Sequence, residues 1–315
     1  MAGQGTKIIA TDYNAIQSKV ALVLGTGSGD TGYGQTVASG QVSVNAKISV
    51  TQWSNLRDDL LKCRQHQTGA DETGNLTTPT TSVKITEADR AAYMNMADTV
   101  TTNRLVTPPS GQATTENVAT PAVRTTNWNG TLTHTVTVTF ASAEAMRYYF
   151  NTGSQFLFTA DRSGGTPASD TKDYVWSHLL GTNLTTYPNG MGIIKFNHNS
   201  TTCTGSGITS AIGYRQLTTA DQVIFQKNAS SYLPNKYYIM ARLVGTTQIV
   251  FTMKFEDSSN SGYRPDSPNE GNPTYPQFGI DEDVTGTLTS TVQVYRASGS
   301  NVSVPLPGGN SSGLA

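Results

Sequence analysis

The amino-acid sequence predicts an α+β protein, with a small N-terminal helical head followed by a β-rich antiparallel, sandwich-like domain that carries one or two short helices. In the first hundred residues, apolar side chains recur at every third or fourth position, which is the spacing of an amphipathic helix. Farther along, they alternate with threonines, as in strands that are covered on one face. Only 14% of the 315 residues are charged, against about a quarter in typical globular domains, and this composition suits hydroxyl-rich strand faces.

The predicted head contains three helices, each with its own start signal. Thr11 is a suitable N-cap for the first helix, the second begins at Thr51, and Thr86 begins the third with Asp89 in a capping-box-like pair. Three helices of this length bury little apolar surface alone, so we expect the head to dock on its own second domain, a sister subunit or another protein. Their apolar stripes are formed by Tyr13, Ile16, Val20 and Val23, by Trp53, Leu56, Leu60 and Cys63, and by Tyr93, Met96 and Val100.

The predicted domain boundaries follow changes in composition. Residues 1–103 form the helical attachment and assembly domain, 104–122 a Pro- and Thr-rich linker, 123–297 the β-rich domain and 298–315 a flexible low-complexity tail. A weak alternation after Tyr33 also indicates a short strand within the head. In the β-rich domain the strands fit a sandwich, a barrel or a less regular sheet. They are expected near residues 131–140, 154–163, 192–199, 237–244, 248–257 and 287–296, with short helices at 142–153 and 171–181.

A glycine-rich stretch, "GTGSGDTGYGQ", raises the question of nucleotide binding. Gly27, Gly29 and Gly32 have the G-x-G-x-x-G spacing of a dinucleotide-binding loop, but that loop works only between a strand and a helix. Here the preceding residues have helical spacing and no helix is predicted after the glycines. We therefore expect a helix that stops at Gly25, followed by a loop with several positive φ angles, and no nucleotide or other cofactor.

No motif for catalysis or metal binding stands out. The four histidines, His66, His134, His178 and His198, are scattered, and His134 fits a satisfied histidine on the apolar face of a strand. The stretch from Asp257 begins like a calcium loop but has Pro268 where the bidentate Glu is required. Cys63 and Cys203 fall in different predicted domains, so no disulfide is expected. We expect a protein that is not an enzyme and has no metal site, although Asp281, Glu282 and Asp283 fit either a cation site or a solvated acidic turn.

Composition and charge also exclude several partners. The net charge is −1 and no Lys/Arg cluster is present, so nucleic-acid binding is not expected. No segment has the length of a membrane span or the pattern of a secretory signal, and membrane insertion is not expected. The long Pro- and Asn-rich stretch from Asp257 places Tyr263, Tyr275 and Phe278 beside polar residues. These aromatic residues suit contact with a sugar or a protein ligand, or they pin the loop down.

Several strings resemble segments of virion structural proteins from contractile-tailed cyanophages and related marine phages. The resemblance covers much of the first hundred residues, through "TDYNAIQSKV", "GYGQ" and "TQWSNLRDDLLKCRQHQTG", and residues 130–165, through "MRYYFNTGSQFLFTADRS". It implies a component of the tail, neck or fibres, and it carries no catalytic residue. The matching positions are Asp12, Tyr13, Asn14, Ile16, Gly32 to Gln35, Trp53, Leu56, Arg57 and Arg147 through Gly153.

The function we expect is a non-enzymatic structural component of a phage virion, assembled in the host cytoplasm from copies of itself and other virion proteins. A symmetric homo-oligomer is expected on general grounds, and trimer and hexamer are both open. One rival is a receptor- or carbohydrate-binding fibre module that contacts a host surface glycan. Another is a polysaccharide hydrolase, for which the sequence offers only scattered acids such as Asp161, Asp170 and Asp173. The residues expected to carry assembly and docking are Tyr13, Ile16, Tyr33, Gly34, Trp53, Leu56 and Arg57.

Overall fold

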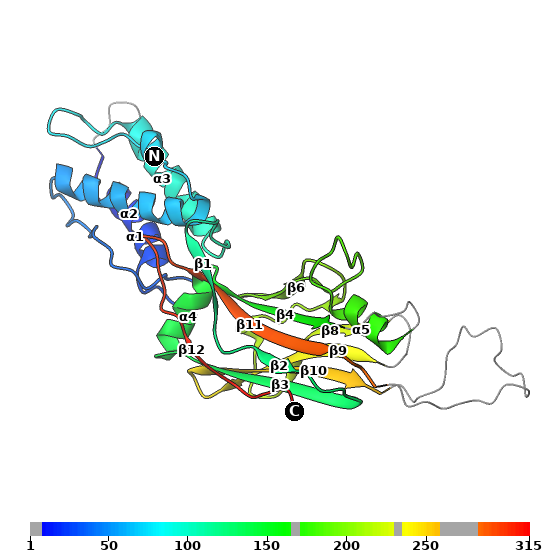
Figure 1. Cartoon of the computed structure of the whole chain (residues 1–315). Helices are drawn as coiled ribbons and strands as arrows, with labels where there is room; N and C mark the ends of the chain where they lie inside the picture. The colour runs from blue at the N-terminus through cyan, green and yellow to red at the C-terminus, as the bar shows by residue number, and fades with distance from the viewer. Residues whose placement is uncertain (1–7, 165–170, 230–234, 259–282) are drawn as a thin grey trace, which may run out of the picture. The chain divides into compact units, whose positions relative to one another are not determined.

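The fold is described from a computed structural model that covers residues 8–164, 171–229, 235–258 and 283–315. An α+β fold is present, with five α-helices and twelve strands in the described residues (Figure 1). The chain divides into two compact units, each built from separate stretches of sequence. We call them the helical unit (residues 1–115, 141–155 and 295–306) and the sandwich unit (residues 116–140, 156–294 and 307–315).

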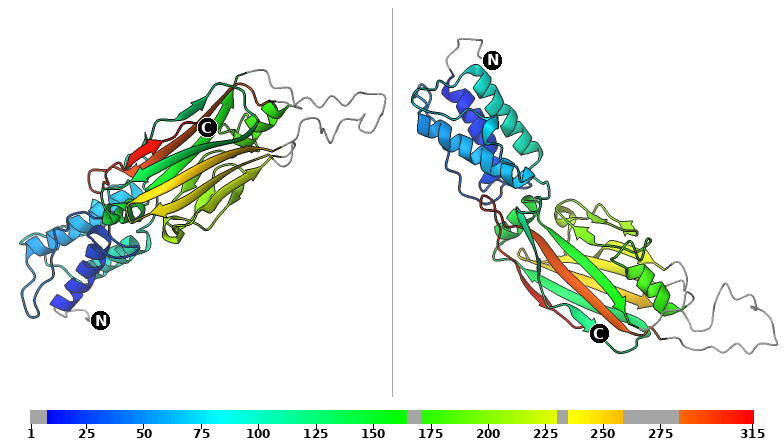
Figure 2. Two further views of the ribbon diagram at one scale, coloured as in Figure 1. Left: turned by 90° about the horizontal axis from the view of Figure 1, so that it is seen from below. Right: turned by 45° about the horizontal axis from the view of Figure 1, so that its top comes forward.

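Three long helices, α1 (Ala10–Leu24), α2 (Val50–Thr68) and α3 (Glu87–Thr102), pack side by side in the helical unit (Figure 2). They run in the same direction. The ring of Trp53 near the start of α2 lies 5.2 Å from that of Tyr13 near the start of α1, and Gln67 near the end of α2 donates to the Val100 carbonyl near the end of α3 (2.9 Å). The predicted apolar stripes form the core between them, and all of their residues are buried. The capping box predicted at Thr86 and Asp89 is confirmed, whereas α2 begins one residue earlier than predicted, at Val50 after the N-cap Ser49.

Parallel helices require long return segments, and polar side chains hold one of these, residues 35–43, against α1 and α2. Asn14 donates to the Val42 carbonyl (2.9 Å) and accepts from the Val42 amide (2.8 Å). The buried Asp59 carboxylate accepts from the amides of Ala38 and Ser39. The short strand predicted here is wrong: the segment forms no strand, because side chains rather than a neighbouring strand satisfy its backbone.

Two later stretches of the chain complete the helical unit. Helix α4 (Ala143–Asn151) lies between two strands in the sequence but belongs to this unit. Residues 295–306 also belong to it, and there the Ser303 carbonyl accepts from the Gln35 side chain (2.9 Å). Val302 and Val304 are buried. The predicted flexible tail from residue 298 is therefore wrong, since its apolar residues and backbone find partners elsewhere in the chain.

The sandwich unit contains two six-stranded sheets that pack face to face. In one sheet the order is β1-β11-β4-β5-β6 with β2 also paired to β11, and in the other it is β12-β3-β10-β9-β8-β7. Phe251 of β10 joins the layers, with ring centroids 5.1 Å from Phe156, 4.9 Å from Phe158 and 5.4 Å from Phe196. The first sheet contains β1 (Ala113–Asn117), β2 (Ala122–Arg124), β4 (Gln155–Ser163), β5 (Ile194–Phe196), β6 (Thr201–Cys203) and β11 (Thr287–Ala297). The second contains β3 (Gly130–Thr139), β7 (Ile208–Thr209), β8 (Gln222–Asn228), β9 (Lys236–Val244), β10 (Gln248–Asp257) and β12 (Gly308–Ser311).

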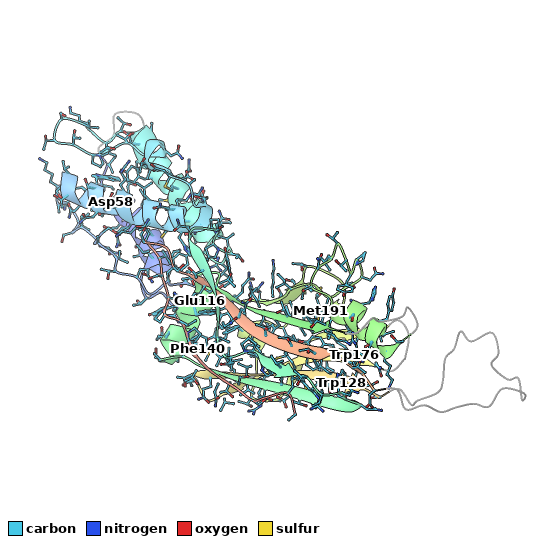
Figure 3. All side chains as sticks on the ribbon, in the orientation of Figure 1. Asp58, Glu116, Trp128, Phe140, Trp176 and Met191 are labelled. Atoms are coloured by element: carbon cyan, nitrogen blue, oxygen red, sulfur yellow. The ribbon has the colours of Figure 1, made fainter. Side chains whose placement is uncertain are left out.

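Alternating burial along β3, β9, β10 and β11 explains why the sequence predicted these four strands. In β3 every second side chain from Leu132 to Val138 is buried, and the antiparallel register sets Val136 opposite Phe251. Trp128 and Phe140, just before and just after β3, lie at opposite ends of the sandwich core, and Trp176 of α5 (Lys172–Leu180) packs on Trp128 with centroids 4.8 Å apart (Figure 3). The predicted linker also contains structure, because β1 falls within residues 104–122. Two 3₁₀ turns, Thr73–Asn75 and Tyr214–Gln216, complete the described elements.

Candidate functional site

The glycine-rich loop of the helical unit ends α1 and folds back onto it. The amides of Tyr33, Gly34 and Gln35 donate to the carbonyls of Val23, Gly25 and Leu24 at 2.8–2.9 Å. All four glycines from Gly27 to Gly34 have positive φ. The predicted helix stop with several positive φ angles is confirmed. A phosphate site needs amides at the N-terminus of a helix, whereas this loop gives its amides to the C-terminal carbonyls of α1, where the helix dipole is negative.

Side chains of helix α4 hold the outer side of the same loop by donating hydrogen bonds to the carbonyls of the loop. The buried Asn151 amide nitrogen donates to the carbonyls of Gly29 (3.2 Å), Thr31 (2.9 Å) and Gly32 (3.3 Å). Arg147 donates to the carbonyls of Thr26 and Thr31. The loop thus packs closely against α4 within one unit. Residues 32–35 of the loop and residues 147–153 of α4 and its C-terminal end are both among the positions that carry the sequence resemblance.

Most residues predicted to dock another subunit lie inside the helical unit instead. Tyr13, Ile16, Tyr33, Trp53 and Leu56 are at most 5% exposed. Gly34 faces the Tyr148 ring, and Arg57 donates to the carbonyls of Thr73 and Leu76 at 2.6 and 3.2 Å. Helical periodicity identified this core, but it could not show whether the stripe is covered by the chain itself or by a partner. Within the helical unit the chain itself covers it, and of these side chains Trp53 also lines the groove described next.

A groove of about 1130 Å³ opens at the end of the helical unit where the three helices begin. Its apolar lining includes Val50, Trp53 and Val83. Ile9 follows the lining residue Ile8, and Val44 lies two residues before the lining residue Ala46; the two side chains are 54% and 78% exposed. We call the groove with Ile9, Val44, Val50 and Val83 the attachment face. Exposed apolar side chains gathered around a concavity mark contact surfaces in soluble proteins.

Positive charge accompanies the attachment face. Lys47, Lys84 and Glu87 are the charged side chains that line the groove. Arg90 neutralises Glu87 through two bonds of 2.6 and 2.8 Å, whereas neither lysine is paired with a carboxylate of the described residues. The N-termini of α1, α2 and α3 also lie at this end. Acidic residues in the first turns of α1 and α3 offset the partial positive charge there, whereas the first turn of α2 has no acidic residue and keeps it. The face therefore suits an apolar segment flanked by carboxylates.

The histidines are distributed between the two units and do not meet. His66 is buried in the helical unit with Nε2 3.0 Å from the Thr152 carbonyl. His134 joins the two sheets of the sandwich, 2.8 Å from both Ser290 Oγ and Ser311 Oγ. Burial lowers the pKa of each imidazole to about 4, so both are neutral structural groups at pH 7. The prediction of a satisfied histidine at position 134 is confirmed.

Of the acidic side chains proposed for hydrolysis, Asp173 is held in structural contacts and Asp161 lies at an exposed position of β4. The Asp173 carboxylate pairs with Arg162 and accepts from the Thr285 amide (2.7 Å). Partial desolvation raises the pKa of Asp161. Asp170 lies outside the described residues, as do Asp281, Glu282 and the predicted ligand residues Tyr263, Tyr275 and Phe278. In the described part of the chain, no group of three His, Cys, Asp or Glu side chains is placed to hold a metal ion.

Comparison with known proteins adds no relative. No protein-family model, curated protein or solved structure matches the chain.

None of the helices in the described segments has the length and apolar character needed to cross a bilayer. Cys63 is buried in the helical unit, Cys203 lies in the sandwich unit, and both are free thiols.

Proposed function

We propose that this protein is a non-enzymatic structural component of a phage virion, which works by assembly with copies of itself and with other virion proteins. The resemblance of its N-terminal and central strings to virion proteins motivates the proposal. The observation that carries it is the attachment face, because exposed apolar side chains around a large groove belong to proteins that are covered by a neighbour. The buried histidines and the paired acids of the described residues also have structural partners, which supports a role without catalysis.

The occupant we propose for the attachment face is another virion protein, through an apolar segment flanked by carboxylates. Lys47, Lys84 and the N-terminus of α2 give the face a positive potential, so two copies of it would repel each other. A carboxylate-bearing segment gains charge complementarity instead, which favours correct partners and speeds encounter. Copies of this chain would then meet through other surfaces.

Particles assembled in the presence of variant chains test this function. With wild-type chain, mass spectrometry of purified particles is expected to find the protein. The double substitution Val44→Asp and Val83→Asp places two carboxylates on the attachment face, and we expect this variant to stay in the soluble fraction. Val123 of the sandwich unit is 55% exposed, and Val123→Asp is the matched control that should enter particles normally.

Different outcomes would overturn the structural function and the role of the attachment face. Purified particles without wild-type chain would overturn the structural function. Normal incorporation of the double variant would overturn the attachment face. Light scattering of the purified chain adds a third arm: an oligomer of wild-type chain alone that the double variant abolishes would show that the occupant is a second copy, against the proposal.

A further inference from the structure

A second cavity in the sandwich unit is lined by residues of α5 and of the end of β8. Figure 1 labels these two elements. Its volume is about 390 Å³, within the range of about 300–1,000 Å³ that is usual for small-molecule sites. Unlike the attachment face, it is lined mainly by hydrogen-bonding groups. The polar and aromatic lining residues are Tyr174, His178, Asn189, Ser206, Lys227 and Asn228.

The rim of this cavity is held by backbone hydrogen bonds between two loops. The Ser206 amide donates to the Gly190 carbonyl (2.9 Å), and the Gly205 amide donates to the carbonyl of the buried Met191 (3.2 Å) (Figure 3). The loops approach so closely that a Cβ on Gly205 would lie 2.1 Å from the Gly190 carbonyl oxygen, and a Cβ on Gly190 would lie 2.2 Å from the Gly181 carbonyl oxygen at the end of α5. Asn189 and Ser206 are thus held on a fixed frame, as a preorganised binding site requires.

Lys227 brings a positive charge that no carboxylate of the described residues neutralises. Its ammonium donates to Ser206 Oγ (3.0 Å) and to the Asn189 carbonyl, which are uncharged acceptors. Burial lowers the pKa of Lys227 to about 8, and the Cys203 thiol acts weakly in the opposite direction. A partly desolvated ammonium gains most from an anion that enters the cavity, because a charge-assisted hydrogen bond replaces its lost hydration.

Aromatic rings form the other side of the cavity. The rings of Tyr174 and His178 are tilted by 30° with centroids 3.8 Å apart, and Tyr187 meets His178 edge-on at 5.0 Å. His178 Nδ1 lies 2.9 Å from the Tyr174 carbonyl. A carbonyl only accepts, so Nδ1 donates and the neutral ring keeps Nε2 as an acceptor. The wall therefore combines an apolar ring surface with a hydrogen-bond acceptor and a phenol hydroxyl.

We propose that this cavity binds a carboxylated sugar unit of a polysaccharide. The Lys227 ammonium bonds the carboxylate, while His178, Asn189, Ser206 and Asn228 bond the ring hydroxyls. The Tyr174 ring covers an apolar face of the sugar, as amphipathic aromatic residues do at wet interfaces. This function is additional to virion assembly and uses the other unit of the chain, so either proposal can fail alone.

Titration of the full chain with defined oligosaccharides tests the site. The probes are a galacturonate trisaccharide, the neutral galactose trisaccharide and inorganic phosphate, each followed by calorimetry and by NMR shifts of the protein. The galacturonate trisaccharide is expected to bind at least about tenfold more tightly than the neutral one, because the neutral sugar lacks the charge-assisted hydrogen bond to Lys227. Phosphate should not displace it at equal concentration.

Substitutions locate the binding and keep the test independent of folding. Lys227→Gln should weaken binding of the galacturonate trisaccharide about tenfold, and Lys227→Arg should restore most of it. Tyr174→Ala should weaken both sugars, whereas Tyr174→Phe keeps the ring and should retain most of the affinity. Lys195→Gln, at a partly exposed lysine of β5, is the matched control with unchanged affinity. Equal affinity for the neutral sugar, displacement by phosphate, or no effect of Lys227→Gln would each overturn the proposal.

Discussion

At the scale of single residues, the tightest requirement is at Gly34. Its φ is +70°, and a Cβ there would lie 2.4 Å from the Tyr148 ring. The guanidinium carbon of Arg147 lies 4.8 Å from the centroid of the same ring. Gly34→Ala is expected to destabilise the helical unit by about 2–4 kcal/mol, through the left-handed backbone and the overpacked ring. Hydrogen exchange should show faster opening of α1 while β10 is unchanged. Gly40→Ala, in open space, is the control. Equal protection of α1 in both variants would contradict the account.

A second residue-scale prediction concerns His134. The unfolded chain takes up a proton on this imidazole near pH 6.5, but burial holds the folded-state pKa at about 4. The unfolded state therefore binds more protons between these values, and the free energy of unfolding falls as the pH decreases from 6.5 to 4. Between pH 7 and pH 4.5 the wild-type sandwich unit should lose on the order of 2–3 kcal/mol of its free energy of unfolding, and His134→Gln should remove this loss. Denaturant unfolding at the two pH values measures it. The same pH dependence in variant and wild type would refute it.

At the scale of elements, the sequence predicts the existence of a helix or strand better than its partner. The periodicity near Met146 indicates α4 correctly, yet nothing local shows that Asn151 satisfies three carbonyls more than a hundred positions earlier. The return segment near Ser39 has the same difficulty, since Asp59 and Asn14 supply its partners from two helices. The second cavity was missed for this reason too: His178 was noted, but Lys227 of β8 and Asn189 of a loop come together only in the folded chain.

The clamp made by α4 can be tested by removing one donor. Asn151→Ala leaves the carbonyls of Gly29 and Gly32 without the donor that they share. Burying unsatisfied carbonyls costs about 1–3 kcal/mol, so α1 and the glycine-rich loop should exchange amide hydrogens faster. Asn95→Ala, at an exposed position of α3, should be neutral or slightly stabilising, because alanine favours helices. Unchanged exchange in the Asn151 variant would mean that Arg147 alone holds the loop.

At the scale of the whole molecule, composition and periodicity predicted the α+β class, but not how the chain divides. The boundary near residue 103 follows a real change from helical to strand spacing. The helical unit nevertheless continues in residues 141–155 and 295–306, because long-range contacts rather than composition decide which unit buries a segment. Tyr295 donates to the Pro108 carbonyl (2.8 Å), and the Ala297 amide donates to Ser154 Oγ (2.9 Å). Neither pairing has a local signature in the sequence.

This three-part construction predicts that cutting the chain will not release the head. A protease site inserted between Ser110 and Gly111, at an exposed turn, would yield fragments 1–110 and 111–315. The second fragment keeps α4 and residues 295–306, whose partners include the glycine-rich loop, His66 and Gln35. The cleaved protein should therefore elute from a sizing column at the position of the uncut chain and separate only in denaturant. Separate elution in native buffer would mean that the head is an independent domain joined by a linker, as composition alone indicates.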